Sequence, residues 1–287
     1  RMFPFFGGAE LGALSTLAIV IACIGGITAV MAALIAFVQM DLKKVLAYST
    51  MSQLAYIFTG LGSALWFANN GYDELAAFAM GASLFHLFNH AMAKGMLFMA
   101  SGSVIHEMHH AHHEVAHHGH DDHDDHDDHF DAQSMENMGG LASRMPITAT
   151  AMFVGSMSII GIPLIGGFWS KEGIIASAWK VAQEEPIFIL PAILVLIGAG
   201  MTGFYMSRMW FMTFAGKPKT DVAKHVHEQT PWIPIPLVVL TFMTLGAIIF
   251  AGMHAGHWLG DFESGHYTNF FDGIGYEMEH VFFNHDP

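Results

Sequence analysis

Residues 147–182 read ITATAMFVGSMSIIGIPLIGGFWSKEGIIASAWKVA, and this run decides the architecture that we expect for the chain. It is apolar but too long for one straight crossing of a bilayer, and at residues 162–167 a proline and two adjacent glycines interrupt it. Proline removes a backbone donor and glycine relaxes the chain, so the run predicts two half-helices. A broken helix at membrane depth persists only where protein or water covers its free backbone groups, typically at a transport site. Lys171 follows the break, which favours a transport site over a simple kink.

The rest of the chain has the composition of a membrane protein. Of its 287 residues, 53% are hydrophobic and 13% are charged, with a mean hydropathy of +0.42, whereas soluble domains carry about 25% charged residues. Five further apolar runs match the ~30 Å hydrocarbon core: residues 11–38, 45–66, 76–105, 187–214 and 232–253. We therefore predict an all-α integral membrane protein with a transmembrane bundle of six spans over residues 1–253.

The distribution of charge predicts the orientation. Alternation of six spans puts the basic residues of the connecting segments on one side, while the segment 254–287 on the other side has no lysine or arginine. By the positive-inside rule the basic side is cytoplasmic, together with a loop at 106–145, and 254–287 is an acidic external tail. The basic residues concerned are Lys43, Lys44, Arg144, Lys217, Lys219 and Lys224.

Charge and cysteine content also exclude several functions. The formal net charge is −14, which argues against a nucleic-acid partner because nucleic acids select a basic face. The single cysteine, Cys23, lies in an apolar run, so disulfides and iron–sulfur ligation within this chain are excluded. The chain begins with Arg1 and shows no signal peptide, and we expect it to be a fragment of a longer protein.

The loop at 106–145 begins with a histidine- and aspartate-rich tract. Residues 106–129 contain 11 histidines in near-repeats of Asp-Asp-His. Such composition can bind zinc, nickel or copper weakly, but the spacing defines no fixed ligand set. We expect a solvated, disordered insertion here, with weak metal binding as the alternative.

Three ionisable residues in the third span form the main candidate site. His86, His90 and Lys94 recur at every fourth position, which places them within about 80° on one helical face. Charged groups at this depth are costly and usually mark an ion or proton path. Histidine titrates near neutrality, and a lysine taken out of water can also exchange protons, so the stripe suits a proton relay. The alternatives are histidines bonded to neighbouring helices with a snorkelling lysine, or a weaker zinc site through the two histidines.

Two further groups of charged residues are candidates. Lys171 and Glu172 directly follow the break, where a lysine beside a carboxylate could change protonation. Asp41 and Lys43 lie between the first two spans, where topology alone would also place charges. Arg208, near the end of the fifth span, suits ion pairing or anchoring because arginine does not titrate usefully.

Five ordered sequence blocks resemble a known family. They are DLKKVLAYSTMSQ at 41–53, HLFNHAMAK at 86–94, SGSVIH at 101–106, MGGL at 138–141 and GFWSKE at 167–172. In this order they resemble the antiporter-like subunits called subunit L or subunit 5 of proton-pumping NADH-quinone oxidoreductases, the respiratory complex I family.

The resemblance implies an antiporter-like bundle of two inverted five-helix repeats, of which this chain looks like the second, with its discontinuous helix, plus one span. It implies that His86, His90, Lys94 and Lys171 line a hydrophilic axis for protons, and that the positions of Asp41, Lys43 and Arg208 are charged. The family's first repeat and its lateral helix are absent here, and Lys171 is followed by one acid, Glu172, where the family usually has two.

The resemblance also implies cofactors and partners outside this chain. NADH, FMN, iron–sulfur clusters and quinone are expected in partner subunits, and other membrane subunits and the lipid bilayer are the expected contacts. A prokaryotic plasma membrane is the expected location. The function that follows is proton translocation driven by redox chemistry elsewhere in the complex. A subunit of a multisubunit sodium/proton antiporter is the main alternative, and a zinc transporter, suggested by the histidine-rich loop alone, is the weaker one.

Overall fold

The computed structural model describes residues 11–118, 130–163, 165–228 and 232–250, and its regular elements within these ranges are helices. In chain order they are α1 (Leu11–Val38), α2 (Leu42–Asn69), α3 (Asp73–His118), η2 (Leu141–Ser143), α4 (Pro146–Ile160), α5 (Gly166–Glu184), η3 (Pro186–Phe188), α6 (Ile189–Phe214), α7 (Asp221–His225) and α8 (Pro234–Phe250). The predicted all-α fold class is confirmed.

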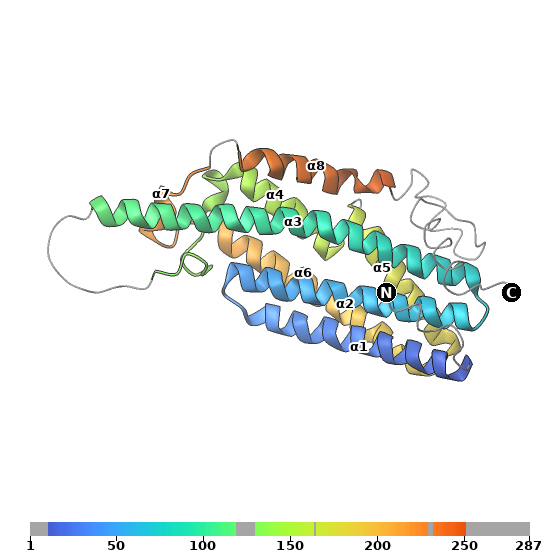
Figure 1. Ribbon diagram of the computed structural model, residues 1–287. Coiled ribbons are helices and arrows are strands. Elements are labelled where there is room, and N and C mark those ends of the chain that lie inside the picture. The colour runs from blue at the N-terminus through green and yellow to red at the C-terminus, as the bar shows by residue number, and fades with distance from the viewer. Residues whose placement is uncertain (1–10, 119–129, 164, 229–231, 251–287) are drawn as a thin grey trace.

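The long helices lie side by side in one bundle (Figure 1). Helix α1 packs against α2 and α6, and α3 packs against α2 on one side and against α4, α5 and α8 on the other. Helices α4 and α5 together cross the bundle beside α3. This arrangement places the polar face of α3 against the region where α4 ends and α5 begins.

The predicted break in the fourth span is confirmed. Helix α4 ends at Ile160, and Gly161 follows it with φ of +86°, a left-handed conformation that glycine adopts at low cost. The Gly161 and Ile162 amides both donate to the Met157 carbonyl at 3.1 Å. Helix α5 then starts at Gly166. The expected discontinuous helix therefore consists of two separately terminated halves.

The third helix is longer than the apolar pattern predicted. We expected a loop from residue 106, but α3 continues to His118. Residues 106–118 contain neither glycine nor proline, and Met108 and Ala111 on this extension are 0% and 2% exposed. The prediction was wrong because hydropathy registers the end of the apolar run, whereas a helix ends only at a breaker or a loss of packing.

The second half of the expected loop is also ordered. Met135, Met138 and Leu141 are fully buried and belong to the same core as Met209 and Phe214 at the end of α6. Residues 130–145 are therefore a packed connecting segment. The solvated, disordered insertion was expected for residues 106–129, and this expectation was wrong for 106–118, which belong to α3. The remainder of the histidine- and aspartate-rich tract, 119–129, and the predicted tail 254–287 lie outside the described residues.

Among the described residues, two segments are each long and apolar enough to cross a membrane unaided, 13–38 and 186–214. Helices α4 and α8 are apolar but shorter, and α3 contains the buried charged stripe. Polar side chains lower the mean hydropathy of a helix. Inside a bundle such side chains face neighbouring helices rather than lipid, so a helix of low mean hydropathy can still cross a membrane.

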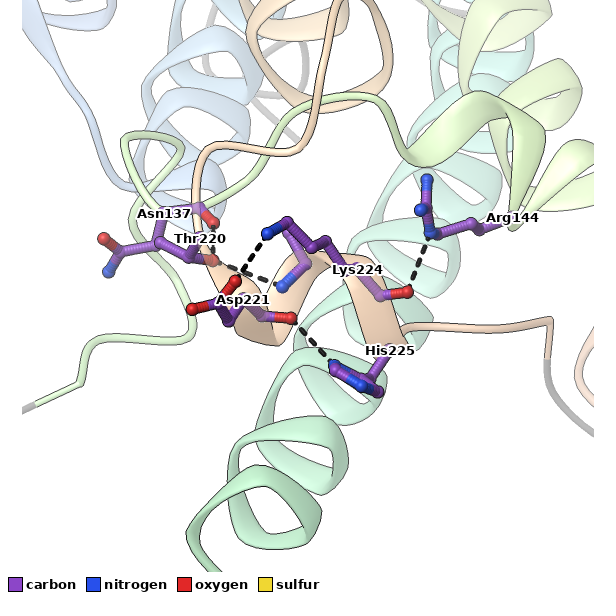
Figure 2. A network of polar contacts seen from close by, with 7 residues as sticks. Asn137, Arg144, Thr220, Asp221, Lys224 and His225 are labelled. Atoms are coloured by element: carbon purple, nitrogen blue, oxygen red, sulfur yellow. Dashed lines mark hydrogen bonds and ion pairs between the residues drawn. The ribbon is translucent and has the colours of Figure 1, made fainter. Parts of the chain in front are cut away.

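The basic connecting segments gather at one end of the bundle, as alternation of the spans predicted. The Lys219 ammonium donates to the Met135 carbonyl at 2.9 Å, and Arg144 Nε donates to the Lys224 carbonyl at 3.0 Å. Figure 2 shows this second contact beside α7. The prediction that this end is cytoplasmic stays a prediction.

Candidate functional site

The polar stripe on α3 is buried in the centre of the bundle. His86, His90 and Lys94 are 3%, 5% and 5% exposed, and the two imidazole rings lie 6.3 Å apart between centroids. The Lys94 ammonium donates to the Leu46 carbonyl on α2 at 3.2 Å. Lys94 therefore points into the bundle rather than snorkelling to a surface.

Lys171 is held by the end of the preceding half-helix. Its ammonium donates to the Ile159 carbonyl at 2.7 Å and to the Ile160 carbonyl at 3.5 Å. The last carbonyls of a helix have no intrahelical partner and carry the negative end of its dipole, which suits a cation. The same ammonium lies 5.1 Å from the centre of the Tyr56 ring, in cation–π contact. The break therefore supplies the seat for a buried charge.

The first turn of α5 joins this lysine to the histidine stripe. Ser170, the residue before Lys171, lies 3.1 Å from His86 Nδ1 through its hydroxyl. Asn89 on α3 donates to the Gly166 carbonyl at 3.0 Å and contacts the Ser170 hydroxyl at 3.4 Å. The tertiary structure therefore brings Lys171 beside the stripe, so that Lys94, His90, His86 and Lys171 form one buried polar file.

Two nitrogens of the file have no hydrogen-bond partner among the described residues. They are the buried Nε2 atoms of His86 and His90. A neutral imidazole presents a donor on one nitrogen and an acceptor on the other, so an unoccupied nitrogen between two amines can take up or release a proton. The file thus contains the groups that a proton relay needs.

A second polar group, which the sequence analysis missed, lies between α2 and α6. The Tyr205 hydroxyl donates to the Ser49 hydroxyl at 3.1 Å, and Gln53 Nε2 donates to the Thr202 hydroxyl at 3.2 Å. Ser49, Gln53 and Tyr56 are spaced four and three residues apart, which is the signal of a polar helical face. Tyr56 connects this group to the file through its contact with Lys171.

The other predicted site residues lie elsewhere. Glu172 is exposed while Lys171 is buried, and no ion pair joins them among the described residues. Asp41 caps α2 by accepting from the Lys44 amide at 3.0 Å, and its carboxylate lies 3.8 Å from the Lys44 ammonium. Lys43 is exposed in the same turn. The structure therefore does not bring Glu172, Asp41 or Lys43 into the file.

Arg208 has the anchoring position that its chemistry suggested. Its guanidinium donates to the Gln39 carbonyl in the turn between α1 and α2, and so ties the end of α6 to that turn. For metal binding, the described part of the chain contains no group of three or more histidine, cysteine, aspartate or glutamate side chains placed to hold an ion. The site is therefore built from amines, imidazoles, hydroxyls and backbone carbonyls.

Fold and site together define a class: a polytopic helical membrane protein in which a broken helix seats one buried lysine and a neighbouring helix carries a second lysine behind two histidines. The comparisons identify the family. The chain belongs to the family described as NADH:quinone oxidoreductase/Mrp antiporter, TM, whose model matches residues 2–202. The resemblance of the five sequence blocks is thus confirmed.

Curated relatives support the same assignment. The chain is 38% identical over 253 residues to NAD(P)H-quinone oxidoreductase subunit 5 of the Chaetosphaeridium globosum chloroplast, covering 85% of this chain and 32% of that protein. It is 35% identical over 251 residues to F(420)H(2) dehydrogenase subunit L of Methanosarcina mazei, covering 85% of this chain and 33% of the relative. The chain therefore spans about a third of the length of these relatives.

Two solved structures share the fold. The Mrp complex from Dietzia sp. DQ12-45-1b aligns with a TM-score of 0.64 at 17% identity, over 94% of this chain and 48% of that one. The membrane-bound sulfane sulfur reductase, an archaeal respiratory membrane complex, aligns with a TM-score of 0.62 at 23% identity, over 86% of this chain and 34% of that one. At these identities the likeness concerns the fold.

Proposed function

We propose that this chain is a proton-translocating part of a membrane subunit in a quinone oxidoreductase complex. The observation that carries the proposal is the buried file in which His86 and His90 lie between two lysines, Lys94 and Lys171. Structural charges in a membrane protein are normally paired with opposite charges, whereas these amines are held by backbone carbonyls. Membership of the family and the names of the curated relatives support the same function.

Each group in the file has a defined part in moving a proton. The Ile159 and Leu46 carbonyls accept hydrogen bonds from the two lysine amines and so fix where a proton can be held. The imidazoles take a proton on one nitrogen and release it from the other, and the Ser170 hydroxyl orients His86. Moving a proton against 100 mV takes about 2.3 kcal/mol, which corresponds to a change of roughly two units in the pKa of one carrier.

The redox chemistry of such a complex belongs to partner subunits. We propose that NADH or a related donor, FMN, iron–sulfur clusters and quinone act there, and that this chain contacts other membrane subunits and lipid. The single Cys23 supports the absence of a cluster in this chain. The relative from Methanosarcina mazei supports a prokaryotic plasma membrane, although chloroplast relatives occur as well.

Proton pumping by the intact complex tests the proposal. We expect Lys171→Ala and Lys94→Ala each to lower the protons moved per electron in proteoliposomes at least twofold while the complex assembles, because each removes a protonatable link. Lys180→Ala is the matched control, since Lys180 is also on α5 but outside the file. Unchanged pumping in both file variants would overturn the relay.

A sodium/proton antiporter subunit is the second candidate. The structural similarity to the Mrp complex covers 94% of this chain, and the family description includes the Mrp antiporter. The same file of amines and imidazoles would conduct protons in either class of protein. The two candidates differ in whether a redox reaction or a sodium gradient drives the protons.

A further inference from the structure

Helix α4, whose last carbonyls hold Lys171, lacks a cap of its own at its other end. The helix starts at Pro146, and the preceding residue, Met145, makes no capping hydrogen bond with its side chain. Proline has no amide to satisfy, but the next two amides, of Ile147 and Thr148, have no partner within the helix. Thr148 is fully buried, so an unpaired amide there would be costly.

A carboxylate from a distant segment supplies the missing cap. Glu228 Oε2 accepts from the Ile147 amide at 2.9 Å and from the Thr148 amide at 3.4 Å. Its other oxygen, Oε1, accepts from the Thr148 hydroxyl at 2.6 Å. An aspartate or serine directly before a helix normally fills this role, whereas here the acceptor comes from beyond α7.

The segment that carries Glu228 is itself fixed to the bundle. The Thr220 hydroxyl donates to the Asn137 carbonyl at 2.7 Å, and Arg144, just before α4, donates to the Lys224 carbonyl (Figure 2). His227 Nδ1 lies 3.6 Å from the buried carboxylate of Glu107 on α3. The segment that leads to Glu228 is therefore held against the bundle by contacts with Asn137, Arg144 and Glu107.

Opposite charges thus bracket α4. Glu228 lies at the amino end, where the helix dipole is positive, and the Lys171 ammonium lies at the carboxyl end, where it is negative. A 15-residue helix is roughly 22 Å long, so the two groups lie at opposite ends of α4 and do not contact each other. The carboxyl end of α4 is also closely packed, since a Cβ on Gly167 of α5 would lie 2.0 Å from the Ser158 carbonyl oxygen.

We propose that Glu228 is a positioning residue for Lys171: by capping α4 it fixes where the Ile159 carbonyl lies, and with it the seat of the ammonium. The consequence for pumping rests on the proposed function. The consequence for the structure of α4 does not, because loss of the cap loosens the half-helix whatever the chain transports.

Backbone hydrogen–deuterium exchange of the intact complex tests the structural step. With Glu228→Ala, we expect faster exchange at Ile147 and Thr148 and also at Gly161 and Ile162, at the far end of α4. A cap with only a local role would change the first turn alone, and unchanged exchange at Gly161 and Ile162 would overturn the proposal. Glu228→Gln keeps one acceptor oxygen, so its exchange should lie closer to that of the wild type.

Asp221→Asn is the matched control for charge. The Lys224 ammonium donates a 2.6 Å hydrogen bond to Asp221, which lowers the pKa of this carboxyl below its ordinary value, so Asp221 is ionised at neutral pH. Its replacement removes one negative charge from the same segment without touching α4. Exchange of α4 should stay at the wild-type rate in this variant. Faster exchange at Gly161 and Ile162 here as well would assign the effect to charge and overturn the cap.

Pumping by the same variants tests the functional step. We expect Glu228→Ala to lower the protons moved per electron about twofold in assembled complex, and to add no loss in a Lys171→Ala background, because both changes act on one group. Independent losses that multiply would contradict the positioning role. If Lys171→Ala itself leaves pumping unchanged, the proposed function fails, while the exchange experiment still decides the cap.

Discussion

At the scale of single residues, the break between α4 and α5 depends on a glycine at position 167. A Cβ built there would lie 2.0 Å from the carbonyl oxygen of Ser158 and 2.9 Å from its hydroxyl oxygen. The obstacle is backbone, which cannot rotate away as a flexible side chain can. Any larger residue must therefore push the two half-helices apart, next to the carbonyls that hold Lys171.

We expect Gly167→Ala to destabilise the subunit by about 1–3 kcal/mol or more, since overpacked cores relax at that cost. Gly200→Ala on α6 is the control, because a Cβ there would meet no atom within 4 Å. Thermal unfolding of the purified complex measures both. Equal midpoints for the two variants would show that the half-helices can separate without cost.

Neighbouring residues also show where sequence reasoning stops. Lys171 and Glu172 are adjacent in the sequence, and we expected their side chains to act together. Successive residues on a helix point about 100° apart, so one faces the file while the other is exposed. The partners that Lys171 has, Ile159 and Tyr56, come from other elements.

At the scale of elements, α3 runs beyond the apolar run that predicted it. Its extension from 106 to 118 packs Met108 and Ala111 into the core formed with the segment 130–145. His109 and His113 are exposed beside these buried positions, and their rings lie 4.8 Å apart between centroids in a tilted arrangement. The extension therefore belongs to the folded bundle.

This packing predicts different costs for two neighbouring substitutions. Met108→Ala should destabilise the subunit by about 2–5 kcal/mol, because Met108 is fully buried and its loss leaves a cavity. His109→Ala, on the exposed face, should stay within about 0.5 kcal/mol. Chemical or thermal unfolding compares the two variants. An unchanged free energy of unfolding for Met108→Ala would support the loop that the sequence predicted.

At the scale of the whole molecule, the chain covers about a third of the length of its curated relatives. Its buried file runs from Lys94, beside the first turns of α2, to Lys171 at the centre of the broken helix. The basic segments lie at the Lys94 end of α2 and beside α7. Under the proposed function, the driving force for protons along this file comes from partner subunits.

Purification from native membranes in mild detergent identifies that driving force. We expect iron–sulfur and quinone-reductase subunits to accompany the chain in mass spectra and optical spectra, and proton pumping to be independent of sodium. Only antiporter-type membrane subunits, with sodium-dependent proton flux and no quinone reduction, would instead assign the chain to the antiporter class. In the first outcome, the accompanying subunits also indicate which donor the complex oxidises.

The sequence by itself determined the helical membrane class, the break at residues 162–167, and the stripe of His86, His90 and Lys94, because hydropathy, proline and helical periodicity are local properties. Only the tertiary structure decided which groups meet. It placed the Ile159 carbonyl on Lys171, Tyr56 over the same ammonium, and Glu228 at the start of α4. These contacts join segments far apart in the chain, and packing of whole helices, which no local pattern encodes, sets them.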